Sequence, residues 1–151
     1  MDEGIIERIN MIYNRILQPI YYISAKRFTI IGHSMEPVIK EGEQIFISNM
    51  YYKLNKVKRN DIIGLHNNQK IEIKRIIGMP EDRLSINQSS IMLNGNEIIN
   101  ASNNQQELKN KEIIIKNEEF FVMGDNYSKS IDSRNYGSIK KNQIIGKVLD
   151  K

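Results

Sequence analysis

The chain has 151 residues, of which 40% are hydrophobic and 26% are charged, proportions that are ordinary for a globular domain and argue against wholesale disorder. It contains no cysteine, which excludes disulfides and thiolate metal sites. The formal net charge of +4 is concentrated in residues 51–80, where seven basic residues stand against two acidic ones.

Residues 1–27 predict a short amphipathic helix or arm in front of the main body. Apolar residues recur there at near-helical spacing between charged ones: Ile5, Ile6, Ile9, Ile16 and Leu17. A membrane-spanning helix needs roughly 20 mostly apolar residues, whereas residues 11–23 are fewer and include Arg15 and Pro19. We therefore expect no membrane span, and a helix that lies on a bilayer or against the body.

Residues 28–151 alternate short apolar runs with turn residues, a texture that predicts one all-β, mainly antiparallel domain. The expected strands are residues 28–31, 44–48, 61–65, 70–77, a short run ending at 86, 91–93, 97–99, 112–115, 119–123 and 144–149. Asn94 and Gly95 lie between two of these runs, which is a strong signal for a hairpin turn. Residues 100–111 are polar and predict a surface loop.

Three motifs contain residues that could take part in catalysis. Residues 32–37 (GHSMEP) place Ser34 in a turn, residues 73–80 (IKRIIGMP) place Lys74 in an apolar strand, and residues 124–137 read GDNYSKSIDSRNYG. A serine hydroxyl is a weak nucleophile until a base removes its proton. Lysine can be that base only when its amine is neutral, and burial among apolar groups lowers a lysine pKa by up to several units. The isoleucines around Lys74 would supply such surroundings.

In this order, the three motifs resemble those of the type I signal peptidases, which are serine proteases with a Ser–Lys dyad, and the resemblance runs from residue 28 to the C-terminus. It implies that Ser34 is the nucleophile and Lys74 the general base, with no cofactor and no metal. It also implies supporting roles, which are as follows: Ser130 hydrogen-bonds the Lys74 amine, Asp132 and Arg134 form a structural ion pair, and Asp125 and Asn126 shape the turn.

The resemblance also implies substrates and a location. Preproteins or leader peptides would be cut after small residues, in the manner of Ala-x-Ala, while lying extended along a sheet edge. The implied location is the extracytoplasmic face of a membrane, with peripheral attachment if the chain has no anchor, and a cytoplasmic location stays open. The basic residues beside Tyr51 and Tyr52 could bind anionic lipid headgroups, with an attraction of about 1 kcal/mol for each Lys or Arg near the surface. The alternative is that they form a solvated rim.

Some residues depart from the family pattern. Strand alternation puts Glu72 on the same face as Lys74, where an ion pair would keep the amine charged, so we expect the strand to end or twist near Glu72. Gly32 stands where some members have a hydroxyl as oxyanion donor. Asn60 and Glu81 stand where glycine is common, and a positive φ at Glu81 would cost about 1 kcal/mol.

Three other functions compete with this interpretation. A self-cleaving repressor-type Ser–Lys peptidase shares the dyad, but only about 27 residues precede the core and they show no helix-turn-helix pattern. A catalytically weak binding or scaffold homologue would be expected to lack Ser34 or Lys74, and both are present. Nucleic-acid binding through the tyrosines and basic residues is the weakest, so we expect no nucleic-acid partner.

Overall fold

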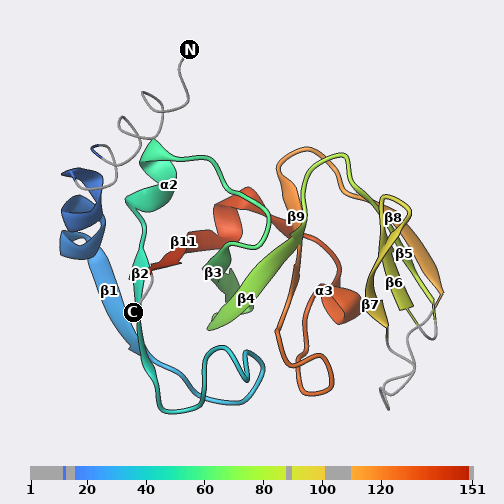
Figure 1. The fold of residues 1–151 in the computed structure, drawn as a ribbon, viewed down its shortest axis with the longest axis horizontal. Coiled ribbons are helices and arrows are strands. Elements are labelled where there is room, and N and C mark those ends of the chain that lie inside the picture. Colours follow the sequence, from blue (N-terminus) through green and yellow to red (C-terminus); the bar gives the residue numbers. More distant parts are fainter. Residues whose placement is uncertain (1–11, 13–15, 88–89, 101–109, 150–151) are drawn as a thin grey trace.

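The computed structural model describes residue 12 and residues 16–87, 90–100 and 110–149. Strands are the main regular structure among these residues (Figure 1). The strands are β1 (Ala25–Thr29), β2 (Gln44–Ser48), β3 (Ile62–Asn67), β4 (Lys70–Gly78), β5 (Arg83–Ile86), β6 (Ser90–Leu93), β7 (Asn96–Asn100), β8 (Lys111–Ile114), β9 (Glu119–Met123), β10 (Ile139–Lys140) and β11 (Ile144–Leu149). Short helical segments are α2 (Tyr51–Leu54), α3 (Ser133–Tyr136) and the 3₁₀ turn η1 (Lys141–Gln143).

The strands form two sheets. A seven-stranded sheet has the order β1-β2-β11-β3-β4-β9-β10, and a four-stranded sheet has the order β7-β6-β5-β8. The four-stranded sheet lies at the opposite end of the molecule from β1 and β2 (Figure 1). Neighbouring strands are antiparallel throughout the described sheets. The predicted all-β, mainly antiparallel class is therefore confirmed.

The predicted strands agree best where an apolar run is flanked by clear turn residues. β2, β9 and β11 have the predicted bounds, whereas β1 begins at Ala25, three residues before the predicted start. Asn94 and Gly95 both have positive φ, 51° and 83°, and they connect β6 to β7 as the predicted hairpin turn. Glu81 also has a positive φ, 73°, so a backbone that favours glycine is occupied by a glutamate there.

The predicted N-terminal arm is described only in part. Residues 16–23 are helical, while residues 1–11 and 13–15 lie outside the described part of the chain. Tyr21 is buried, and its ring centroid lies 4.9 Å from that of Tyr51 at the start of α2. Ile16 and Ile23 of the helix are exposed. No described helix has the length and apolar character that crossing a bilayer requires.

Buried side chains form three apolar clusters, and two of them support the Ser34 and Lys74 motifs. One cluster lies under the turn that follows β1: Ile30, Met35, Ile39, Ile45, Ile47 and Val148. Another contains Ile76 of β4 together with residues of β3 and β9. β4 lies between β3 and β9 in the sheet, so side chains on its buried face are enclosed from both sides.

Candidate active site

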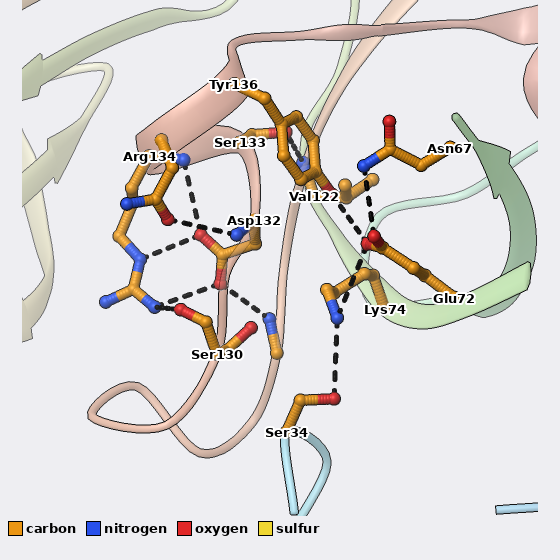
Figure 2. Close-up of polar contacts among 12 residues, drawn as sticks. Ser34, Asn67, Glu72, Lys74, Val122, Ser130, Asp132, Ser133, Arg134 and Tyr136 are labelled. Carbon is orange, nitrogen blue, oxygen red and sulfur yellow. Dashed lines mark hydrogen bonds and ion pairs between the residues drawn. The ribbon is translucent and has the colours of Figure 1, made fainter. Parts of the chain in front are cut away.

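Ser34 and Lys74, forty positions apart in the chain, face each other in the folded protein (Figure 2). The Lys74 amine lies 3.4 Å from Ser34 Oγ, at the long end of hydrogen-bond reach. Met35, only 1% exposed, anchors the Ser34 turn in the apolar cluster below it. The main-chain N–H of Asn126 donates to the Ser34 carbonyl at 2.9 Å, which ties the turn to the third motif.

The Lys74 side chain is held in a largely dry environment. The residue is 4% exposed and lies on the buried face of β4, opposite Ile63 of β3. Burial lowers the pKa of Lys74 below its ordinary value, because the charged ammonium loses its hydration. The carboxylates of Glu72 and Asp132 act in the opposite direction, and burial outweighs them.

Glu72 lies beside Lys74, contrary to the expectation that the strand would end or twist near Glu72. β4 continues through Glu72, which pairs with Leu65 of β3 in regular register. Two-residue alternation therefore places both side chains on one face, and the Glu72 Oε2 atom lies 3.7 Å from the Lys74 amine. The two-residue alternation of the strand already indicated this arrangement. The expectation was wrong because it assumed that a neutral lysine requires Glu72 to be turned away.

Two neutral donors hold the Glu72 carboxylate. Asn67 at the end of β3 donates its Nδ2 to Glu72 Oε1 at 3.0 Å. The Tyr136 hydroxyl donates to Oε2 at 3.2 Å from α3, as Figure 2 shows. Burial, followed by the nearby Glu72 charge, raises the pKa of Tyr136, so its phenol stays protonated and able to donate. Sequence reasoning missed Asn67 and Tyr136, because neither lies at a position that the motif resemblance assigns.

Asp132 and Arg134 form a buried ion pair in the third motif. Arg134 Nε donates to Asp132 Oδ1 at 2.8 Å and Nη2 donates to Oδ2 at 2.9 Å, with side-chain exposures of 2% and 0%. Asp132 Oδ2 also accepts the main-chain N–H of Gly124 at 3.0 Å, and Arg134 donates to the Ser130 carbonyl at 3.1 Å. These bonds fix the loop that packs beside the dyad.

Asp125 connects the third motif to β4. It accepts two hydrogen bonds of 2.7 Å from the guanidinium of Arg75, at Oδ1 and Oδ2. Arg75 follows Lys74 in β4 and also donates to the carbonyl of Asn60 at 2.9 Å. The contribution of Asp125 therefore extends beyond its own turn, because this paired contact holds the loop against the strand that carries Lys74.

Ser130 does not make the hydrogen bond that the resemblance implies. Its Oγ is buried and has no hydrogen-bond partner among the described residues, while the Lys74 amine contacts Ser34 and Glu72. Ser130 nevertheless lies close to the dyad. A Cβ atom added to Gly124 would overlap both Ser130 Oγ and the Ser34 carbonyl, so only glycine lets these groups pack so closely.

We expect Gly124→Ala to lower the turnover of any reaction at Ser34 by roughly tenfold to a hundredfold, because a displacement of about 1 Å at a reacting group can cost that much. The methyl group must push the Ser34 carbonyl or the Ser130 hydroxyl away. Gly95→Ala is the control: the positive φ of Gly95, which Gly124 does not share, strains alanine in the β6–β7 turn, but the added Cβ would meet open space there and no group of the site. Turnover of Gly124→Ala equal to that of Gly95→Ala would contradict the tight packing.

A groove of about 460 Å³ runs past the dyad. Its lining includes Ser34, Glu72, Lys74, Ile31, Ile71 and Ile131. Ile31 is 92% exposed, and Ile71 and Ile131 are exposed as well, so the groove has apolar side chains at its mouth. Within the part of the chain that the structure describes, histidines and carboxylates form no cluster that could hold a metal ion.

Comparison with known proteins identifies the family. Residues 8–149 match the family described as signal peptidase, peptidase S26. Signal peptidase I of Bacillus caldolyticus is 30% identical, over 80% of this chain and 75% of that protein, and signal peptidase IB of Staphylococcus aureus is 29% identical, over 80% and 74%. The crystal structure of an Enterococcus faecalis signal peptidase I is 25% identical, with a TM-score of 0.51, and covers 64% of this chain and 98% of that one. The chain therefore belongs to the signal peptidase S26 family.

Proposed function

We propose that the protein is a serine endopeptidase of signal peptidase I type, with Ser34 as nucleophile and Lys74 as general base. The observation that carries the proposal is the 3.4 Å separation of Ser34 Oγ and the Lys74 amine, with Lys74 only 4% exposed. A hydroxyl next to a buried amine is the arrangement in which lysine can accept the serine proton. The reaction needs no cofactor.

In the proposed mechanism, the neutral Lys74 amine takes the proton from Ser34 Oγ as the oxygen attacks the scissile carbonyl. The resulting ammonium gives this proton to the leaving amine, the peptide bond breaks, and an ester joins the substrate to Ser34. A water molecule then gives a proton to Lys74 and attacks the ester carbonyl. Collapse of this second tetrahedral intermediate returns the proton to Ser34 Oγ and releases the acid product.

The groove supports a peptide substrate in extended conformation. It is lined by Thr29 and Ile30 at the end of β1 as well as by Ser34, and β1 is an edge strand of the seven-stranded sheet. An edge strand offers main-chain donors and acceptors to an added peptide strand. We propose that the substrates are preproteins or leader peptides with small residues before the cut, in keeping with the family.

A membrane surface is the proposed working environment. The helical residues 16–23 expose the apolar side chains of Ile16, Ile20 and Ile23. Exposed Lys53 and Lys56 lie in and just beyond α2, against which Tyr21 of the helix packs. Apolar side chains next to lysines suit the interface of an anionic bilayer.

The direct test is cleavage of a synthetic leader peptide that ends its recognition segment in Ala-x-Ala. Purified protein is incubated with this peptide, with and without anionic vesicles, and products are identified by mass spectrometry. We expect one cut after the second alanine, faster with vesicles. A peptide with tryptophan in place of that alanine is the matched control and should stay intact. Failure to cut the alanine peptide under both conditions would refute the proposed function.

The pH dependence of cleavage should reveal the lysine base. Because burial lowers the pKa of Lys74, its amine becomes neutral at a lower pH than an exposed lysine would, and kcat/KM should rise with pH through that lowered value. Below it the amine is protonated and cannot accept the serine proton, so we expect activity to be lost in acid. Stopped assays of initial rate from pH 5 to pH 10 measure this, and full activity retained at pH 5 would contradict a lysine base.

A further inference from the structure

We propose that Glu72 is the positioning residue for Lys74: its braced carboxylate holds the amine toward Ser34 and sets the pH range in which the dyad works. This inference rests on the proposed function, since it concerns the base of the same site. Glu72 lies two residues before Lys74 on β4, on the same face of the strand, and lines the same groove. Neither the serine motif nor the third motif assigns it a part.

The carboxylate is fixed in place. Each oxygen of Glu72 accepts a bond from a neutral donor, Oε1 from Asn67 and Oε2 from Tyr136, and these donors come from β3 and α3. The side chain is 21% exposed, so it is partly shielded from solvent screening. A carboxylate held from two sides presents its charge to the Lys74 amine, 3.7 Å away, in one defined direction.

The Lys74 amine has few other acceptors. Ser130 Oγ, which the family pattern would supply, has no hydrogen-bond partner among the described residues. A buried ammonium needs acceptors or an opposite charge nearby: here Ser34 Oγ lies 3.4 Å from the amine as a hydrogen-bond partner, and the Glu72 carboxylate lies 3.7 Å away as an ion-pair partner. Glu72 thereby does the orienting that was expected of Ser130, and the amine stays within reach of Ser34 Oγ.

Several charged groups act on Lys74, and Glu72 is the principal one. Burial lowers its pKa most, followed by the raising effect of Glu72, while Asp132 raises it and Arg134 lowers it. Asp132 and Arg134 largely neutralise each other in their buried ion pair. Lys129 and His33 line the same groove, and Tyr136 contacts Glu72 as a neutral phenol. Removing the Glu72 charge should therefore change the proton affinity of Lys74 more than removing any of the others.

Glu72 has two opposite effects on the reaction. At rest it favours the protonated amine, which reduces the fraction of enzyme able to react at a given pH. During attack it stabilises the ammonium that Lys74 becomes, much as the aspartate of a serine protease triad stabilises the imidazolium. Loss of the charge should thus extend activity to lower pH and at the same time weaken the base, which lowers the rate at the high-pH plateau.

Glu72→Gln tests this directly, because glutamine keeps an acceptor for Asn67 or Tyr136 and nearly the same volume. We expect the acidic limb of kcat/KM to move down by roughly one to three pH units, the effect usual for a nearby opposite charge. The plateau should fall by roughly tenfold, because proton transfer follows the strength of the base. Glu72→Asp, which keeps the charge, should leave the limb closer to that of the unmodified protein.

The control is Glu112→Gln, the same chemical change at an exposed position on β8 in the other sheet. Its pH profile should superimpose on that of the unmodified protein. A variant that merely folded less well would lose rate at every pH without moving the limb. An acidic limb in Glu72→Gln at the same pH as in Glu112→Gln, or at higher pH, would overturn the inference.

A second measurement separates this inference from the proposed function. The full-length protein labelled with ¹³C-lysine is titrated by NMR, and the Lys74 Cε signal is assigned by its absence in Lys74→Met. We expect the Lys74 midpoint to be lower in Glu72→Gln than in the unmodified protein. Equal midpoints would overturn the role of Glu72 even if Ser34-dependent cleavage is observed. A lowered midpoint in a protein without cleavage would support the role of Glu72 and refute the peptidase.

Discussion

Replacing Ser34 with alanine should lower kcat for leader-peptide cleavage by on the order of 10⁶-fold, the scale seen when a serine protease loses its nucleophile. The Ser34 hydroxyl is the group that the Lys74 amine contacts across the groove. The free energy of unfolding should stay within about 0.5 kcal/mol, because Ser34 is only half-buried and its anchoring contacts are made by its carbonyl and by Met35. Kinetic assays and denaturant unfolding of the same preparation measure both quantities.

The matched control is Ser128→Ala. Ser128 is exposed in the loop of the third motif, and its hydroxyl donates to Asn126 rather than to the dyad. Its activity should equal that of the unmodified protein, so that a loss confined to Ser34→Ala shows that a contaminating protease is not responsible for cleavage. Cleavage by Ser34→Ala at the unmodified rate would remove Ser34 as the nucleophile and with it the serine mechanism.

Lys74→Met belongs to the same experiment. Methionine fills a buried space of similar length without a charge, so the apolar surroundings are kept while the base is lost. We expect a loss of the same order as for Ser34→Ala, and no further loss in the double variant, because residues that act as one unit are strongly non-additive. Additive losses would indicate two independent functions instead of a dyad.

The largest effect on stability is expected from Asp132→Ala, which should lower the free energy of unfolding by about 3–5 kcal/mol, the cost of leaving one partner of a buried ion pair uncompensated. The substitution leaves the Arg134 guanidinium, which is 2% exposed, without its carboxylate partner, and it removes the acceptor of the Gly124 N–H. For a domain whose total stability is typically about 5–15 kcal/mol, this is a large fraction. Urea unfolding followed by circular dichroism gives the number.

The control is Glu118→Ala, which breaks the pair between Glu118 and Lys141 on the surface. Both of those side chains are mostly exposed, so the loss should be no more than about 1 kcal/mol. If Asp132→Ala destabilised the protein no more than Glu118→Ala, the buried pair would not be what holds the loop. Asp132→Asn, which keeps the hydrogen-bonding shape without the charge, should fall between the two.

Sequence alone was sufficient for the local features. Strand alternation and turn residues predicted β2, β9 and β11 at their observed bounds, because both depend on neighbours a few positions away. The turn at Asn94 and Gly95 was readable for the same reason. The three motifs also contain Ser34, Lys74 and the Asp132–Arg134 pair, which the fold brings together, and the family membership follows from the match over residues 8–149.

The tertiary structure alone decided how the groups at the site are paired. The order of strands within a sheet, with β11 between β2 and β3, depends on long-range packing that local patterns do not encode. Long-range packing also decides the Asp125–Arg75 pair and the hydrogen bonds from Asn67 and Tyr136 to Glu72. It likewise leaves Ser130 Oγ without a partner among the residues that the structure describes. The proton affinity of Lys74 depends on burial by residues distant in the chain, on the neighbouring charge of Glu72, and on the charges of Asp132 and Arg134, which the fold brings close.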